Sequence, residues 1–211
     1  MVQDTARARQ TRQKPDDRRT QILQAATTVI FERGLADARI ADVAERAGVS
    51  AGLVIYYFGS KEHLLAQALA HLNDRFYLQV SRMMTELPTA RARLEHLIDL
   101  SVPGYLEGDD DRRDEWALWM EVWGRALRDP QLAREREVLD RRWRETIAGV
   151  IRAGQTGGEF PPGDAEELAL RLSAVMDGLS VQVVLNDALV TPERMRRTCL
   201  EMAAREIGFA L

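Results

Sequence analysis

The sequence contains almost no cysteine and no long apolar run. Its single cysteine, Cys199, excludes an internal disulfide and a Cys-x-x-Cys metal site, and it is typical of a protein kept in a reducing compartment. No apolar run approaches the roughly 20 residues that a membrane-spanning helix needs, and the basic N-terminal segment is not followed by the apolar segment of a secretory signal. We therefore expect a cytoplasmic protein without a membrane partner.

The chain also carries no large excess of either positive or negative charge. The chain has 29 Lys and Arg against 33 Asp and Glu, a formal net charge of −4, which excludes a protein that is basic over its whole surface. The balance differs along the chain, because residues 1–61 carry ten basic and seven acidic side chains whereas residues 62–211 carry nineteen and twenty-six. A positively charged N-terminal region of this kind is suited to binding phosphate groups. The acidic remainder of the chain would be repelled by them.

Enzyme motifs are missing as well. The histidines His63, His71 and His96 do not fall at metal-ligand spacings, and neither a phosphate-binding glycine loop nor a Gly-x-Ser-x-Gly motif occurs. We expect no enzymatic activity, no metal and no cofactor.

The residues that are present predict helix almost throughout. Apolar residues recur at helical spacing between prolines and glycines, and no stretch shows the alternation of a half-buried strand. The pattern predicts an all-α fold of about nine helices, preceded by a polar arm over residues 1–16. The expected helices are 17–34, 39–47, 51–58, 61–84, 89–102, 112–128, 131–154, 164–187 and 191–209.

Residues 40–58, IADVAERAGVSAGLVIYYF, predict two short helices joined by a tight turn. Gly48 permits the left-handed backbone of the turn, Val49 fills the turn from the apolar side, and Ser50 caps the second helix. A pair of helices joined in this way places the second one in the major groove of DNA. An αα-corner inside a helical bundle is the alternative that these residues alone leave open.

Around this motif the sequence resembles the TetR family of transcriptional regulators. The resemblance rests on RTQILQAA at 19–26, FERG at 31–34 and YFGSKEHLL at 57–65. It implies a DNA-binding head over 17–61 and a body over 62–211 that binds an effector and dimerises. It also implies a repressor that binds a palindromic operator in double-stranded DNA as a homodimer and is released by a small molecule. A helical adaptor or enzyme with a vestigial helix-turn-helix is the alternative.

The resemblance also implies which residues contact DNA. Ala38 stands where a hydroxyl residue is usual and Ile55 where an aromatic one is usual, so two phosphate contacts are expected to be missing, and Arg39 is a candidate to compensate. Because the second helix offers few hydrogen-bonding side chains, we expect phosphate contacts and DNA shape to carry much of the affinity. The expected DNA-contacting residues are Arg39, Ser50, Ala51, Gly52, Leu53, Ile55, Tyr56, Tyr57 and the phosphate-binding Lys61.

Helix 164–187 has two apolar stripes, whereas a surface helix needs only one. One stripe suits the core of its own chain, and the other runs through small residues such as Gly178 and suits a second copy. The resemblance implies that this helix and the last one pair across a twofold axis, and a helix buried wholly within one chain is the alternative. The expected interface residues are Ala174, Gly178, Val181, Leu185, Met195, Cys199 and Met202.

Three of the four tryptophans, Trp116, Trp119 and Trp123, fall on one face of the expected helix 112–128, with Met120 beside them. Core packing explains such a stripe, and so does the lining of an effector cavity. Asp177 lies among apolar residues, and a carboxylate near aromatic faces favours a cationic or amphipathic ligand. The segment around Asp177 resembles the BetI-type branch of the family, which implies an amine or choline-like effector, although a structural role for this acid stays open.

Overall fold

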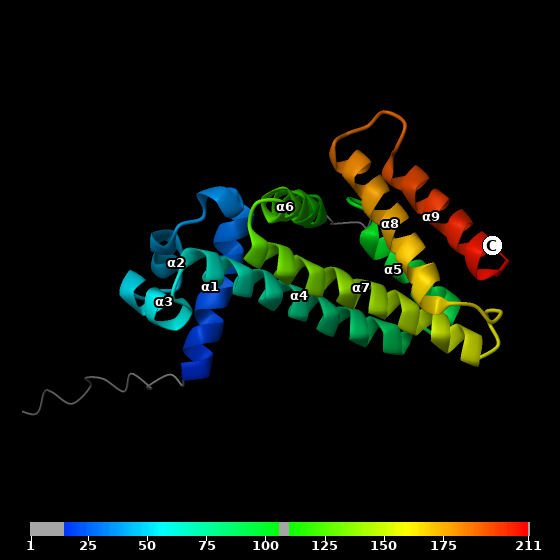
Figure 1. Cartoon of the computed structure of the whole chain (residues 1–211), viewed down its shortest axis with the longest axis horizontal. Helices are drawn as coiled ribbons and strands as arrows, with labels where there is room; N and C mark the ends of the chain where they lie inside the picture. Colours follow the sequence, from blue (N-terminus) through cyan, green and yellow to red (C-terminus); the bar gives the residue numbers. More distant parts are fainter. Residues whose placement is uncertain (1–14, 106–109, 211) are drawn as a thin grey trace, which may run out of the picture. The chain divides into compact units, whose positions relative to one another are not determined.

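The computed structural model describes residues 15–105 and 110–210, and within these ranges every regular element is a helix (Figure 1). The all-α prediction is confirmed. The predicted arm over residues 1–16 lies almost entirely outside the described residues. The helices of the described part are α1 (Pro15–Asp37), α2 (Ile40–Arg46), α3 (Ala51–Phe58), α4 (Lys61–Glu86), α5 (Ala90–Ser101), α6 (Asp110–Ala126), α7 (Pro130–Thr156), α8 (Ala165–Val184) and α9 (Pro192–Ile207).

The chain divides into two compact units, the first ending at His71 and the second starting at Leu72. The division falls inside α4, later than the boundary expected at Lys61. The first turns of α4 bury apolar side chains such as Leu64 and Leu65, and these turns belong to the first unit. No helix in the described ranges is long and apolar enough to cross a membrane.

The first unit consists of α1, α2, α3 and the beginning of α4. In α1, Ile22, Ala26 and Val29 recur at helical spacing and are almost completely buried, as the apolar pattern predicted. Gly34 has a φ of +76°, so the regular helix breaks at the residue where the sequence predicted its end.

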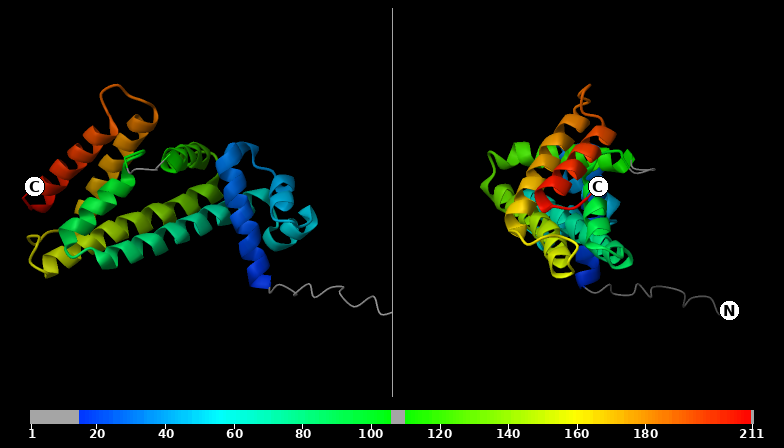
Figure 2. Two further views of the ribbon diagram at one scale, coloured as in Figure 1. Left: turned by 180° about the vertical axis from the view of Figure 1, so that it is seen from behind. Right: turned by 90° about the vertical axis from the view of Figure 1, so that its right-hand side faces the viewer.

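The second unit has its core between α5, α7, α8 and α9. α8 packs along α9 as an antiparallel neighbour, and α6 packs against α7 and α8 (Figures 1 and 2). Capping side chains begin α8 and α9, where Asp164 and Thr191 accept backbone N–H groups. The largest fully buried side chains of this core are Leu94, Leu97, Ile98, Ile147, Ile151, Leu172, Met176 and Met195.

Candidate nucleic-acid interface and effector site

The turn between α2 and α3 is held by hydrogen bonds on both sides. Ser50 begins α3, and its Oγ accepts the N–H of Leu53 at 3.2 Å, which confirms the predicted cap. Gly48 has a φ of +62°, the left-handed geometry that the sequence predicted. From α1, Nε2 of Gln21 donates to the carbonyl of Ala47 at 2.9 Å. α1 therefore fixes the end of α2 at the point where the chain turns into α3.

The inner face of α3 is anchored by two buried residues, Val54 and Phe58. The guanidinium of Arg19 on α1 lies over the Phe58 ring, with Cζ 5.4 Å from the ring centroid. Arg19 also donates to Oε1 of Gln67 on α4. The orientation of α3 is thus set by side chains of both flanking helices.

The outer face of α3 is exposed and carries no charged residue. Tyr56 is 81% exposed and Ile55 is 42% exposed, and the ring of Tyr57 packs edge-on against Tyr56 with centroids 5.5 Å apart. A Cβ added to Gly52 would meet only Oγ of Ser50, at 3.9 Å, so the fold itself does not require glycine there. The residues expected to contact DNA that are exposed or half-buried here are Ser50, Ala51, Gly52, Leu53, Ile55, Tyr56 and Tyr57.

Two cations, Arg39 and Lys61, were also expected to contact DNA. Nζ of Lys61 donates to the carbonyl of Ala36 at 3.0 Å, near the end of α1. Arg39 is exposed and precedes α2. Ala38 is only 1% exposed. The absence of a phosphate contact at Ala38 stays a prediction, and the buried methyl group is consistent with it.

Two other arginines of the first unit, one on α1 and one on α2, form ion pairs within it. Arg33 pairs with Asp42 at 3.0 Å, and Arg46 pairs with Glu32 at 2.6 Å. Exposed pairs of this kind contribute little to stability, but they reduce the charge that these arginines present to a phosphate.

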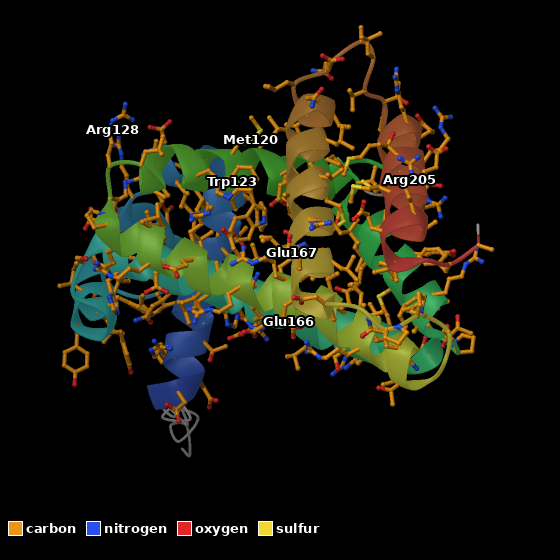
Figure 3. The ribbon with its side chains drawn as sticks, turned by 45° about the vertical axis from the view of Figure 1, so that its right-hand side comes forward. Met120, Trp123, Arg128, Glu166, Glu167 and Arg205 are labelled. Carbon is orange, nitrogen blue, oxygen red and sulfur yellow. The ribbon has the colours of Figure 1, made fainter. Side chains whose placement is uncertain are left out.

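In the second unit, the face of α6 that is buried is aliphatic and is not the face that carries the tryptophans. Among the residues of α6 whose side chains the structure describes, 115–126, Leu118 and Val122 are buried. The predicted effector residues are only partly covered, and Met120 and Trp123 lie beside α8 in Figure 3. Core packing and the lining of an effector cavity both stay open as explanations of the aromatic stripe. The half-buried residues of this stripe are Trp116, Trp119, Met120 and Trp123.

Trp123 combines an aromatic contact with a polar atom that lacks a partner. Its ring meets that of Trp116 edge-on, with centroids 6.0 Å apart. Its Nε1 is buried, and within the described part of the chain no acceptor lies within hydrogen-bonding distance. Buried N–H groups are rarely left unsatisfied, so this one needs an explanation.

Asp177 on α8 is half-buried and faces charged groups of α7. Burial, and to a smaller extent the neighbouring carboxylate of Asp140, raise the pKa of Asp177 to about 6, although Arg144 and Arg136 act in the opposite direction. Burial also raises the pKa of Asp140, which pairs with Arg136 one turn earlier. Sequence reasoning missed Asp140, because its spacing from Arg136 and Arg144 indicates only the ion pairs of an exposed helix face.

The two apolar stripes of α8 have different surroundings. The stripe containing Leu172 packs into the core of the second unit. The other stripe is open, and a Cβ added at Gly178 would meet nothing within 4 Å. This open stripe consists of Leu170, Ala174, Gly178, Val181 and Leu185.

On α9, the expectation that Met195 and Cys199 face a second copy is wrong. Both are fully buried in the core of their own protomer, because α9 turns them toward α5 and α8. Burial also raises the pKa of the Cys199 thiol to about 12, so this cysteine stays protonated. Met202 is half-buried, and beside it Arg171 of α8 pairs with Glu206 of α9 at 3.0 Å.

The class of protein follows from comparison with known families. Residues 22–68 match the bacterial regulatory proteins of the tetR family, and residues 90–208 match the C-terminal region of BetI-type transcriptional repressors. The chain therefore belongs to the TetR family of DNA-binding transcriptional regulators. Within that family its C-terminal region is of the BetI type, as the residues around Asp177 indicated. Members of the family are regulators rather than enzymes.

Similar proteins cover nearly the whole chain. The BetI regulator of Cronobacter sakazakii is 28% identical over 193 residues, 92% of each chain. The structure of a transcriptional regulator from Saccharomonospora viridis in complex with choline is 33% identical, with a TM-score of 0.75 and coverage of 91% of this chain and 98% of that one. A TetR-family structure from Rhodococcus sp. is 29% identical, with a TM-score of 0.75 and coverage of 90% and 97%.

Proposed function

We propose that the chain is a repressor that binds a palindromic operator as a homodimer and leaves it when a small cationic effector binds the body. The observation that carries this proposal is the exposed, uncharged outer face of α3, presented on a turn that Ser50, Gly48 and Gln21 hold in place. Similarity to BetI regulators supports the repressor function. The choline-bound relative supports a quaternary ammonium as the effector.

In the proposed head, residues 17–61, DNA contacts divide into two kinds. Lys61 and Arg39 bind phosphate, since the Lys61 ammonium uses one of its three N–H groups on Ala36 and keeps two for an anion. Tyr56 and Ser50 donate to base edges or phosphates, and the apolar side chains of α3 contact thymine methyl groups. Gly52 lets the helix approach the groove closely.

The proposed body, residues 62–211, dimerises through the open stripe of α8. Leu170 and Leu185 expose apolar surface, and Ala174 and Gly178 permit close approach of a second helix. A twofold axis through this stripe brings the same surface of both protomers together, as an isologous interface requires. Met202 of α9 extends the interface. Two heads in such a dimer suit operator half-sites about 34–36 Å apart.

The proposed effector site lies among α6, α7 and α8. Trp116, Trp119, Trp123 and Met120 supply polarisable faces, and a cation over an indole ring gains about 0.5–2 kcal/mol. Asp177 supplies negative charge next to Asp140. A cation placed near these two acids relieves their mutual repulsion, which the chain by itself only partly offsets with Arg136 and Arg144.

The test uses the full-length protein and the intergenic DNA upstream of its gene. We expect a retarded complex whose affinity falls steeply with salt, and we expect choline to dissociate it. Asp177→Asn should keep operator binding and lose release by choline. The absence of any complex at low salt supports the adaptor with a vestigial helix-turn-helix instead. A complex that choline does not dissociate overturns the effector class alone.

A further inference from the structure

The outward face of α3 carries very few polar atoms. The exposed positions of this helix are Ala51, Gly52, Ile55 and Tyr56. Each of the first two lies one turn before one of the last two, so the four share one face of the helix. Among them only Tyr56 has a polar atom in its side chain. A helix that enters the major groove with this face therefore presents mainly methyl and methylene groups to the base edges.

The hydroxyl groups beside this face do not distinguish thymine from cytosine. In the major groove, thymine presents an O4 acceptor and a C5-methyl group, whereas cytosine presents an N4 donor. The hydroxyls of Ser50, Tyr56 and Tyr57 both donate and accept hydrogen bonds, so each of them suits O4 as well as N4.

The purine partners are not distinguished by α3 either. Bidentate recognition of guanine needs an arginine or lysine, and that of adenine needs an asparagine or glutamine. The sequence of α3, AGLVIYYF, contains none of these four residue types. The feature of a base pair that remains for this helix to detect is the methyl group on C5 of a pyrimidine, because it gains from apolar contact.

We propose that α3 reads the C5-methyl groups of pyrimidines and treats 5-methylcytosine as thymine. The inference rests on the proposed operator binding and adds what the recognition helix distinguishes in the groove. The methyl group of 5-methylcytosine is carried on the same ring atom as that of thymine, so it offers the same apolar contact to Ala51 and Ile55. Methylation of a cytosine that faces α3 therefore strengthens operator binding, and DNA methylation becomes a second signal beside the effector.

The test uses fluorescence anisotropy with the intact protein and synthetic operator DNA. The operator is first located by retardation of the intergenic DNA upstream of the gene. Its thymines are then replaced one at a time by uracil, which removes only the C5-methyl group. At a position where uracil weakens binding, four base pairs are compared: T·A, U·A, 5-methylcytosine·G and C·G. We expect the methyl group to strengthen binding about fourfold in both contexts, as burial of one methyl group allows.

Ile55→Ala removes the larger of the two proposed apolar contacts. In this variant the fourfold effect of the methyl group should fall toward onefold in both contexts. Ile55 is exposed, so the fold should be retained, which thermal unfolding checks. Val138→Ala on α7 is the matched control, because it shortens another exposed β-branched residue outside the proposed head, and it should keep the fourfold effect.

A methyl effect in the T·A context and none in the C·G context overturns the inference, because α3 then recognises thymine as a whole base. Uracil that weakens binding at no position overturns it as well and leaves operator binding intact. A methyl effect that survives Ile55→Ala at every sensitive position also overturns it, since another part of the protein then contacts the methyl groups. If no operator DNA is retarded at low salt, the proposed function and the inference fail together.

Discussion

The guanidinium of Arg19 covers the ring of Phe58, with Cζ 5.4 Å from the ring centroid, and at the same time donates a hydrogen bond to Gln67. One side chain of α1 thus contacts the last residue of α3 and the second turn of α4. Cation–π contacts of this kind contribute about 0.5–1 kcal/mol at partly exposed sites. Arg19 fixes the recognition helix from behind and is a positioning residue.

Arg19→Met should therefore weaken operator binding three- to tenfold by loosening α3, without changing how strongly binding depends on salt. Lys61→Met provides the comparison, because loss of a phosphate contact reduces the slope of log K against log salt by about 0.9 for each contact. Fluorescence anisotropy over a range of salt concentrations measures both quantities. If Arg19→Met reduces the slope as Lys61→Met does, Arg19 contacts phosphate directly.

Gly52→Ala should have opposite effects on stability and on DNA binding. The added Cβ meets only Oγ of Ser50 at 3.9 Å, so removing a helical glycine should stabilise the protein by about 0.5–1 kcal/mol. The same methyl group should weaken operator binding, because it lies on the face proposed to enter the groove. Gly149→Ala on α7 is the control, since that position is also open. This variant should be more stable than the wild type and keep its operator affinity. Unchanged operator affinity in Gly52→Ala would show that the groove does not approach this residue.

Gly178→Glu should dissociate the dimer without unfolding the protomer. Nothing within 4 Å opposes a side chain at Gly178 in one protomer, whereas the twofold axis would bring two new carboxylates together. Gly124→Glu on α6 is the matched control, because that helical glycine is equally open. Analytical ultracentrifugation should give a monomer for the first variant and a dimer for the second. A dimer in both variants places the interface elsewhere.

The contribution of Asp177 to the stability of the unliganded protein should decrease as pH rises from about 4 to about 6. Burial raises the folded pKa of Asp177 to about 6, well above the ordinary value of an aspartate, so the native state holds a proton that the unfolded chain has lost in this window. Asp177→Asn should remove the free-energy cost of burying an ionised carboxylate. The variant should therefore be more stable than the wild type at pH 8 by about 1–3 kcal/mol. The advantage should vanish below about pH 4. Urea unfolding at several pH values measures this difference.

Binding of choline should show the reverse dependence on pH. The ammonium charge of choline does not titrate, so any pH dependence reports the protein, and the ionised form of Asp177 is the one that attracts a cation. Affinity should fall as pH drops through about 6, the raised pKa of Asp177. Calorimetry between pH 5 and 8, at roughly one-unit intervals, tests this expectation. An affinity independent of pH in this range excludes Asp177 as the counter-ion.

Local features were predictable because neighbouring residues determine them. The Ser50 cap and the positive φ of Gly48 depend on a few adjacent residues, and both are confirmed. Errors arose where burial depends on helices distant in sequence. Met195 and Cys199 have the apolar character of interface residues, yet α9 directs them into its own core. Asp140 was not predicted at all, because only the packing of α7 on α8 brings it near Asp177.

The amino-acid sequence by itself determined the all-α class, the helix-turn-helix and the two-faced character of α8, because helical periodicity and capping act over one or two turns. Tertiary packing decided which of the α8 stripes stays open, which residues of α9 are hidden, and that the Trp123 N–H is buried without an acceptor among the described residues. Periodicity identifies a face but not its partner. The partner depends on which helices meet, and that meeting also determines which polar groups are left for a ligand.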